Sequence, residues 1–379
     1  MHIYQLGNIA DKKAALKQLG VQSAGVSIMA HKMELFYFFI KDLKAPAANI
    51  LKQDALSIGA DLAVPSGVIL CEKPTYDCIL IGSKKQMKIL SKKELAQPFG
   101  LKSVANALIK FLSLKVFPLQ IMGVINANDD SFFKGSRFVA ADAISQIEKM
   151  IVNGANIVDI GAVSSRPGAV EVSEDEELKR VKPICDIIKS RKLNEKIIFS
   201  IDSYTPSVIE YALKSGFAIV NDIRGASNEK VIELAVKYSS KLCIMHMQGT
   251  PQTMQENPNY DDIMVEVSEF FEERIAKCEK LGLGRENIIL DVGIGFGKTL
   301  KHNLTLIKNL NHFKHFGCEL LIGASRKSMI DKIIPSTTEE RLAGTLAIHL
   351  KAVENGANIV RCHDVKEHKQ ALAVAEALN

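Results

Sequence analysis

From about residue 117 onward, short apolar runs alternate with longer stretches in which apolar residues recur every three or four positions. The short runs have the length of buried strands, and the longer stretches have the period of amphipathic helices. The strand-like runs are residues 119–125, 157–160, 197–201, 218–220, 242–245, 288–290, 319–322 and 358–361, and the helical stretches include 138–152, 175–189, 207–213, 229–238, 261–281 and 339–355. Strands that alternate with helices over about 260 residues predict an α/β protein with a (β/α)8 TIM barrel, and a doubly wound open sheet is the alternative.

The first 115 residues show helix and strand signals without this repeat. They contain a charged helical beginning at 11–19, an apolar run at 34–40, strand-like pieces at 67–71 and 78–82, and a closing helix at about 101–112. We therefore predict a small α+β N-terminal domain over residues 1–115, whose role the sequence leaves open, followed by a barrel domain over residues 116–379.

Composition and charge are those of an ordinary globular protein. The chain has 379 residues, of which 47% are hydrophobic, and a formal net charge of +5. Its basic residues are scattered among acids, it has no tryptophan, and 6% of its residues are aromatic. This pattern disfavours nucleic-acid binding, which needs a concentrated basic surface and stacking side chains. The lysines within 84–88 and 92–93 could form a weak binding site for anions, but a solvated surface is the favoured explanation.

The seven cysteines form no C-x-x-C pair and are odd in number. They predict reduced, mostly buried thiols and neither a disulfide framework nor a zinc cluster. The first residues lack the basic region and apolar core of a signal peptide, and no run approaches the ~18 apolar residues of a membrane span. We therefore expect a cytoplasmic protein that does not bind a membrane.

Polar residues follow every predicted strand of the barrel. Functional groups of such barrels lie at the C-terminal ends of the strands, so these residues are expected at one site. They are Asn126, Asp159 with 164–168, Asp202, Asn221 with Asp222, Met245 with His246, Asp291, 325–328 and 361–364. Taken singly, Asp159 or Asp222 is better explained as a cap of the next turn, and His246 or His302 as an ordinary hydrogen-bonded histidine. Eight polar endings in a row indicate a site.

The sixth ending, residues 289–299, is an apolar run that closes with Asp291 and then breaks into three alternating glycines, Gly293, Gly295 and Gly297. A phosphate-binding P-loop would need a glycine five residues before Gly297, and that position is Val292. The P-loop interpretation therefore fails. What remains is a carboxylate at a strand end beside a loop whose backbone a ligand can approach closely.

The polar endings sort by charge into two groups. Arg361 and His363 are two positions apart on a strand and so point to the same side. With Asn126 and Ser165 they predict a corner that holds a polyanion such as pyrophosphate. The acceptors Asp202, Asn221 and Asp291 suit a ligand edge that is rich in N–H donors, because buried carboxylates require hydrogen-bond partners.

The region from about residue 119 to the C-terminus resembles dihydropteroate synthase. The stretches that carry the resemblance are 121–126, 165–168, 200–204, 221–222, 245–251, 291–299, 323–328 and 361–364, which follow the family's order. The resemblance does not cover the N-terminal 115 residues or so. It implies a transferase that joins para-aminobenzoate to a dihydropterin carrying a methyl diphosphate. Pyrophosphate leaves before the amine attacks, so the pterin briefly carries a positive charge.

The resemblance also assigns roles to residues. Catalytic roles are implied for Asp202, Asp291, Lys327, Asp130 and Arg166, and substrate-binding roles for Asn221, Met245, Phe296, Gly323, Ser328, Ser165, Arg361, His363, Phe132 and Pro167. The resemblance assigns the pterin edge to Asp202, Asn221 and Asp291, with Met245 packing on the ring and Lys327 contacting it. The resemblance assigns the diphosphate to Asn126, Ser165, Arg361 and His363. It places Mg2+ at Asn126, since this hard cation prefers oxygen ligands and is often shared with substrate phosphates. Phe296, Lys327, Ser328 and the loops after the first two strands line the aminobenzoate pocket.

The chain departs from the family pattern in the loops after the first two strands. Asn128 and Asp129 replace threonine and proline in the first loop, Val163 replaces an acid, and Ser165 replaces threonine. Losing the proline makes the first loop less restrained. Closure of that loop, and sensitivity to sulfonamides that mimic aminobenzoate, are therefore left open.

The residues are compatible with two alternative functions. A pterin-binding methyltransferase barrel would share the pterin-holding acids, but Lys327 and the pair Arg361 and His363 disfavour it because a methyl-folate has no diphosphate. A non-catalytic pterin-binding protein is the other alternative, because of the altered first loop and the extra N-terminal domain. The residues leave the oligomeric state open, although the resemblance makes a homodimer the assembly to test.

Overall fold

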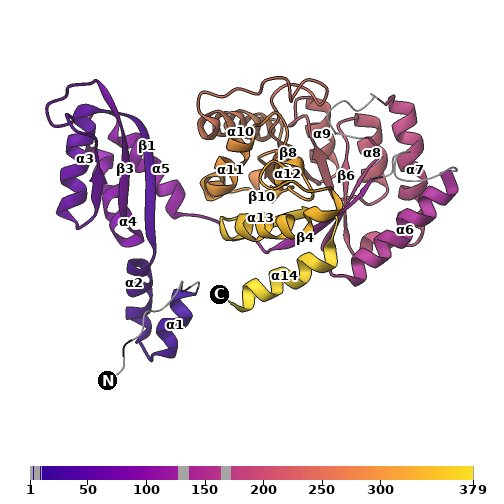
Figure 1. Ribbon diagram of the computed structural model, residues 1–379, viewed down its shortest axis with the longest axis horizontal. Helices are drawn as coiled ribbons and strands as arrows, with labels where there is room; N and C mark the ends of the chain where they lie inside the picture. The colour runs from indigo at the N-terminus through magenta and orange to yellow at the C-terminus, as the bar shows by residue number, and fades with distance from the viewer. Residues whose placement is uncertain (1–2, 4–8, 10, 127–135, 164–171, 379) are drawn as a thin grey trace. The chain divides into compact units, whose positions relative to one another are not determined.

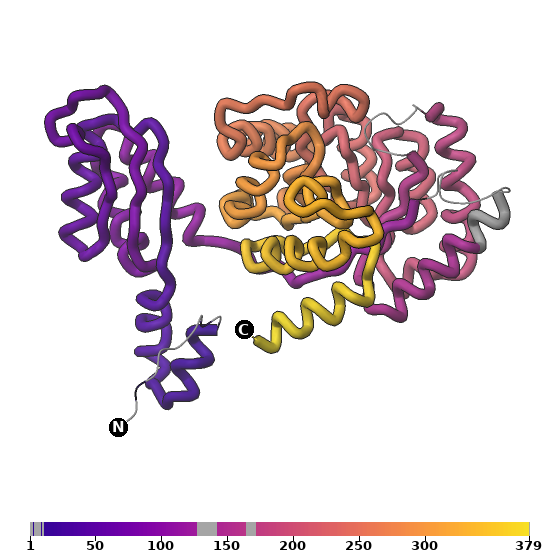
Figure 2. The backbone as a smooth tube through the Cα atoms, in the orientation of Figure 1, coloured from indigo at the N-terminus to yellow at the C-terminus, as the bar shows by residue number. Residues whose placement is uncertain are grey.

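The structure is a computed structural model that describes residues 3, 9, 11–126, 136–163 and 172–378, the side chains of 136–141 excepted. The chain divides into two compact units. The first comprises Met1–Leu114 with Leu378–Asn379, and the second comprises Lys115–Ala377. Each unit is described by itself, and Figures 1 and 2 show the course of the chain through both.

The second unit is a closed barrel whose strand order is β10-β11-β4-β5-β6-β7-β8-β9, with every neighbouring pair parallel. Its strands are β4 (Gln120–Asn126), β5 (Ile157–Gly161), β6 (Ile198–Asp202), β7 (Ile219–Asp222), β8 (Lys241–Met245), β9 (Ile288–Asp291), β10 (Glu319–Ile322) and β11 (Ile359–Cys362). The predicted (β/α)8 barrel is confirmed, and the alternative of an open sheet is wrong.

Helices surround these strands (Figure 1). They are α6 (Ser136–Val152), α7 (Glu174–Ser190), α8 (Pro206–Lys214), α9 (Glu229–Lys237), α10 (Ile263–Lys280), α11 (Leu300–Lys308), α12 (Ser328–Asp331), α13 (Leu342–Glu354) and α14 (Val365–Ala377). Residues at the N-termini of several of these helices explain where the helices begin. Side chains of Ser173, Asn228 and Asp262 cap α7, α9 and α10, and four acids in the first turn of α7 favour the positive end of its dipole. Over the part of the chain that is described, no helix is long and apolar enough to cross a membrane.

Two layers of apolar side chains hold the barrel together. Strand residues such as Val158, Phe199 and Leu290 point outward and pack with the helices in one large core. The alternate residues point inward, and seven of them form a separate layer inside the barrel: Met122, Ile157, Ile219, Cys243, Ile289, Leu321 and Ile359. Strands buried on both faces explain why the sequence shows continuous apolar runs and no alternation with polar residues.

The first unit contains an antiparallel sheet of three strands in the order β1-β3-β2. Its strands are β1 (Leu35–Lys44), β2 (Asp61–Ala63) and β3 (Thr75–Ser83), and its helices are α1 (Lys12–Gln18), α2 (Ser23–Met33), α3 (Ala45–Ser57), α4 (Lys84–Lys93) and α5 (Leu101–Leu112). It has its own apolar core, in which Leu51, Leu62, Leu80, Leu90 and Leu101 are fully buried. A small α+β part is therefore present at the N-terminus, as predicted.

One predicted strand of this unit is wrong. Residues 67–71 form a turn, in which the amides of Leu70 and Cys71 donate to the carbonyl oxygens of Gly67 and Val68. Gly67 has φ of 83°, which a strand residue does not adopt. Only Val68 is buried, whereas Ile69 and Leu70 are 80% and 74% exposed, so the run was apolar without being a core strand.

Candidate active site

A layer of mainly polar side chains lies next to the inward apolar layer of the barrel. Side chains alternate between the two faces of a strand, so the residue two positions after each apolar one also points inward. These residues are Val124, Asp159, Asn221, Met245, Asp291, Gly323 and Arg361. Asp202 pairs with Asn221 in the β6–β7 register and lies at the same level. The barrel thus brings together six predicted site residues, namely Asp202, Asn221, Met245, Asp291, Gly323 and Arg361.

Arg361 links two carboxylates of this layer. Its Nε donates to Asp159 Oδ2 at 2.7 Å, and its Nη2 donates to Asp202 Oδ2 at 2.8 Å. Asn221 Nδ2 donates to the same Asp159 oxygen at 2.9 Å. One connected network therefore joins the residues predicted for the pterin edge, Asp202 and Asn221, to a residue predicted for the diphosphate.

Asp159 is the member of this network to which the sequence assigned no role, because, although it is one of the polar strand endings, it was better explained singly as a cap of the next turn. Its side chain is fully buried, and its Oδ1 has no hydrogen-bond partner among the described residues. The signal that could have found it is its position two residues after the inward Ile157. By contrast, Asp222 does cap a turn, accepting from the amides of Arg224 and Ala226 at 2.8 and 2.9 Å.

Burial shapes the ionisation of the site's acids. It raises the pKa of Asp202 to about 7, and the neighbouring Arg361 charge opposes that rise. Burial likewise raises the pKa of Asp291, opposed by Lys327 and by the amide of Gly293, which donates to Asp291 Oδ1 at 2.8 Å. The cations Arg361 and Lys327 therefore favour the charged forms of these two carboxylates, in opposition to burial.

Lys327 lies between the acid of β9 and the aromatic ring of the glycine-rich turn. Its Nζ donates to the carbonyl oxygen of Ile294 and lies 4.4 Å from the centroid of the Phe296 ring. Burial lowers the pKa of Lys327 to about 8, whereas the charge of Asp291 raises it. Lys327 and Phe296, both predicted for the aminobenzoate pocket, are thus in contact.

The loops after β10 and β11 are tied to each other. Ser325 Oγ and His363 Nδ1 are 2.8 Å apart, and Arg326 donates to both oxygens of Asp364 at 3.0 and 2.7 Å. Arg326 adopts a φ of 54°, which a side chain disfavours, so these bonds hold a strained residue directly before Lys327. Arg361 contacts two acids and His363 contacts a serine, and their role as a diphosphate corner stays a prediction.

The other predicted site residues occupy different positions. Asn126 is the last residue of β4 and is partly exposed, and Ser328 is the exposed first residue of α12. Asp130, Phe132, Ser165, Arg166 and Pro167 lie outside the described residues.

The donor set at Asn126 fits magnesium only with help from a substrate. Among the described residues, no group of three or more histidine, cysteine, aspartate or glutamate side chains could hold a metal ion. Asn126 offers one amide oxygen at a partly exposed strand end. Mg2+ typically takes one or two protein oxygens together with phosphate oxygens and water, so this residue fits such a shared site.

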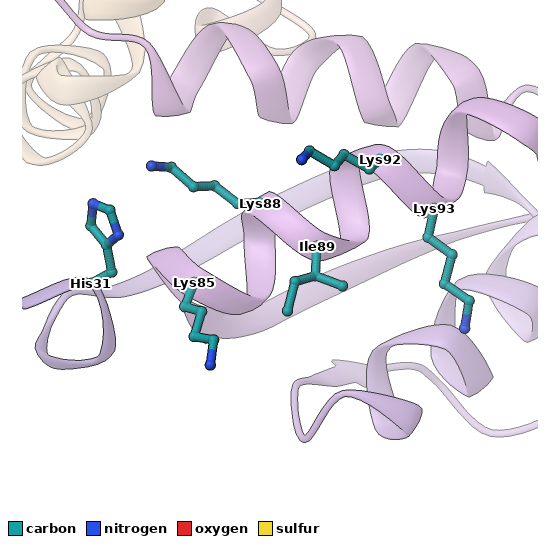
Figure 3. Close-up of a pocket in the computed structure, with 6 residues that line it drawn as sticks. All are labelled: His31, Lys85, Lys88, Ile89, Lys92 and Lys93. Atoms are coloured by element: carbon teal, nitrogen blue, oxygen red, sulfur yellow. The ribbon is translucent and has the colours of Figure 1, made fainter. Parts of the chain in front are cut away.

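A cluster of lysines lies in the first unit, around a hollow of about 480 Å³ lined by His31, Lys85, Lys88, Ile89, Lys92 and Lys93. Figure 3 shows Lys88 and Lys92 projecting from one side of α4, and Lys85 and Lys93 from the other. Lys93 is paired with Asp54 at 2.7 Å. Because the ammonium groups diverge, the arrangement favours a solvated face over an anion site.

Comparison with known proteins decides the family. The chain matches a family described as pterin binding enzyme over residues 122–363, which is more than half of its length. A bifunctional dihydropteroate synthase/dihydropteroate reductase from Helicobacter pylori (strain ATCC 700392 / 26695) is 41% identical over 367 residues, 97% of this chain and 96% of the relative. The chain belongs to the dihydropteroate synthase family.

Other members match the barrel region alone. The dihydropteroate synthase of Escherichia coli (strain K12) is 44% identical over 266 residues, 70% of this chain and 93% of the relative. The solved dihydropteroate synthase of Yersinia pestis in a sulfonamide drug complex is 38% identical, with a TM-score of 0.65 over 70% of this chain and 97% of that chain. The chain is accordingly a transferase with dihydropteroate synthase activity in folate biosynthesis. The methyltransferase and non-catalytic alternatives are set aside.

Proposed function

We propose that the inward polar layer is where this synthase holds 6-hydroxymethyl-7,8-dihydropterin diphosphate and joins it to para-aminobenzoate. The bond between the pterin methylene carbon and the diphosphate oxygen breaks, and pyrophosphate leaves with the electron pair. The aminobenzoate nitrogen then forms the new bond to that carbon and releases one proton. The products are 7,8-dihydropteroate and pyrophosphate.

The observation that carries the proposal is the network of Arg361 with Asp159, Asp202 and Asn221 at the strand ends. Asp202 and Asp291 supply negative charge at the ends of β6 and β9 in the same polar layer, where a pterin cation would develop. Fixed charges in a water-poor site stabilise developing charge strongly because they need no reorganisation. The pterin edge is assigned to Asp202, Asn221 and Asp291, with Met245 against the ring and Gly323 leaving room beside Arg361.

The aminobenzoate is assigned to the segments that follow β9 and β10. Lys327 and Phe296 are in contact there, and Ser328 begins the helix that follows. The Lys327 ammonium offers a counter-charge for the carboxylate of aminobenzoate. Arg166, Pro167, Phe132 and Asp130 complete the pocket in this proposal. Sulfonamides that mimic aminobenzoate would compete at the same place.

A direct assay tests the proposal. The protein is mixed with the pterin diphosphate, with and without para-aminobenzoate, and both pyrophosphate and dihydropteroate are measured. We expect the two products in equal amounts and only when both substrates are present. Pyrophosphate that appears at the same rate without aminobenzoate would contradict the transferase assignment.

Magnesium is assigned to Asn126 and the diphosphate, with Ser165, Arg361 and His363 as further diphosphate contacts. When bound, the ion would neutralise charge on the leaving pyrophosphate. Replacing Asn126 by alanine is expected to raise the Mg2+ concentration for half-maximal activity by about tenfold, because one oxygen ligand is lost while the phosphate and water ligands remain. A Mg2+ titration of the wild type and the variant at saturating substrates measures this, and identical titration curves would refute the site.

A second activity, reduction of dihydropteroate, is favoured by the coverage of the relatives. The Escherichia coli synthase matches 70% of the chain, whereas the bifunctional Helicobacter pylori relative matches 97% of it. The additional match falls on the first unit, which has its own core. We therefore assign a dihydropteroate reductase activity to this chain that requires residues 1–114. The step adds a hydride from an external two-electron donor and a proton to the pterin ring.

Removing residues 1–114 is expected to abolish dihydropteroate reduction and to leave synthase kcat within about twofold, because the barrel has its own core and relatives of barrel length are synthases. Reduction is measured as dihydropteroate loss with reduced nicotinamide or reduced flavin as the donor. Retained synthase activity shows that the truncated barrel folds. Reduction by the truncated protein at the full rate would place that activity in the barrel.

Location and assembly are further proposals. A cytoplasmic location is supported by seven cysteines that are all unpaired, six of them buried. A homodimer is supported only by the family resemblance. Light scattering on the purified chain tests it, and a monomeric mass would exclude the dimer.

A further inference from the structure

Lys298 is an unusual lysine because its side chain is almost completely buried, with 1% of its surface exposed. Its Nζ lies 2.9 Å from His246 Nδ1, 3.1 Å from the His246 carbonyl oxygen and 2.9 Å from the Phe296 carbonyl oxygen. An ammonium group has three N–H donors, so these three acceptors satisfy it completely. Lys298 therefore joins the segment after β8 to the glycine-rich turn after β9.

The contact also fixes the state of His246. An ammonium group only donates, so Nδ1 of His246 must accept and its ring proton is on Nε2. Burial and the charge of Lys298 lower the pKa of His246 to about 3, which keeps the ring neutral. The ring packs edge-on against Phe270, with centroids 4.9 Å apart. His246 is thus a rigid anchor and not a titrating group near neutral pH.

The turn fits closely against this anchor. Gly293 has φ of 64°, and a Cβ on it would lie 2.0 Å from the His246 carbonyl oxygen, so only glycine allows the approach. Nearer the surface, Gln255 and Tyr260 donate to the carbonyl oxygens of Gly295 and Gly297, both at 2.7 Å. Lys298 holds the turn from the buried side, through the carbonyl of Phe296 itself.

We propose that Lys298 is a positioning residue that places Phe296 for aminobenzoate binding, which rests on the function proposed above. Phe296 lies in the turn and its carbonyl oxygen accepts from Lys298, whereas Asp291 lies on β9 and is held by the strand ladder and by the Gly293 amide. Loss of the Lys298 bonds therefore acts on the aminobenzoate side, whereas loss of the Lys298 charge reaches Asp291 only as a minor influence on the pKa of that carboxyl. The lysine does not contact either substrate.

The same contacts predict that aminobenzoate binding depends on pH. Burial lowers the pKa of Lys298 to about 7, with Asp291 opposing and Lys327 reinforcing the shift. The other titratable groups that face it are His246, His302 and Tyr260; both histidines have lowered pKa values and Tyr260 has a raised one. A neutral amine has two N–H donors for the two carbonyl oxygens, and it keeps the contact with His246 Nδ1 only if the ring proton moves there from Nε2; all three bonds then lack the ammonium charge. The KM for aminobenzoate should therefore rise as pH increases through about 7.

The test compares Lys298→Met, Lys298→Gln and the control Lys301→Met, an exposed lysine of α11. We expect Lys298→Met to raise the KM for aminobenzoate by about tenfold, with kcat and the KM for the pterin diphosphate within about threefold of wild type. Lys298→Gln, which retains two donors, should be intermediate, and Lys301→Met should match the wild type. The rise of the aminobenzoate KM through about pH 7 should be present in the wild type and absent in Lys298→Met, whereas a further rise through about pH 8, from loss of the Lys327 charge, should occur in both.

Three results would overturn the inference. They are an unchanged aminobenzoate KM in Lys298→Met, an equal rise in both KM values, or the same pH dependence in that variant and the wild type. If Lys298→Met does not fold, the graded comparison with Lys298→Gln decides, and a wild-type aminobenzoate KM in Lys298→Gln counts against the inference. Failure of the wild type to form dihydropteroate would instead refute the proposed function.

Discussion

Replacement of Asp202 by asparagine is expected to lower kcat of the synthase reaction by about 10²- to 10³-fold. The substitution keeps the shape of the side chain but removes one of the two negative charges assigned to the developing pterin cation. The same loss is expected for Asp291→Asn. Both are measured as dihydropteroate formation at saturating concentrations of both substrates.

Asp175→Asn is a matched control, because Asp175 is an exposed acid in the first turn of α7. Its kcat should stay within about twofold of the wild type. Circular dichroism and thermal unfolding of each variant show whether the fold is retained. Near-normal turnover in both Asp202→Asn and Asp291→Asn would refute the assignment of the cation to this layer.

Arg361→Gln is expected to have the second large effect, on binding and on stability together. It leaves Asp159 and Asp202 as buried carboxylates without a counter-charge, which typically costs about 3–5 kcal/mol. It also removes the cation assigned to the diphosphate. Calorimetry should show at least about tenfold weaker binding of the pterin diphosphate and a smaller loss for a pterin without phosphates, because Asp202 also loses its counter-charge. Equal loss for both ligands would exclude the diphosphate role.

The stability loss of Arg361→Gln should depend on pH in a defined direction. Burial raises the pKa of Asp202 to about 7 even with Arg361 present. When the pKa of an acid is higher in the folded state than its usual value of about 4, the folded protein loses stability as pH rises from about 4 to the folded-state pKa. Without Arg361 the pKa rises further, and the loss extends above pH 7. Urea unfolding should show a larger deficit at about pH 8.5 than at about pH 5, and a deficit that is larger at low pH would contradict this account.

The positions of the strands and the inward direction of the site could be predicted from the sequence. Apolar runs of strand length specify the barrel because its parallel strands are buried on both faces. The two-residue period then places Asn221, Asp291 and Arg361 in one layer. Residues 67–71 were misassigned because apolar composition alone does not reveal that Gly67 starts a turn.

The pairing of charges could not be predicted. Arg361 lies 202 residues from Asp159 and 159 residues from Asp202 along the chain, so only the closed barrel shows that one guanidinium contacts both. The burial of Lys298 was likewise hidden, since a lysine after a glycine-rich turn is as compatible with solvent as with a core position. Its three acceptors come from two different loops, which only the fold brings together.

A crystal structure of the chain with the dihydropterin diphosphate bound, in the absence of aminobenzoate, tests the central assignment most directly. The account predicts the pterin edge within hydrogen-bond distance of Asn221 and Asp291, and the diphosphate within reach of Arg361 and His363. A pterin bound elsewhere, or a diphosphate that contacts neither Arg361 nor His363, would contradict it.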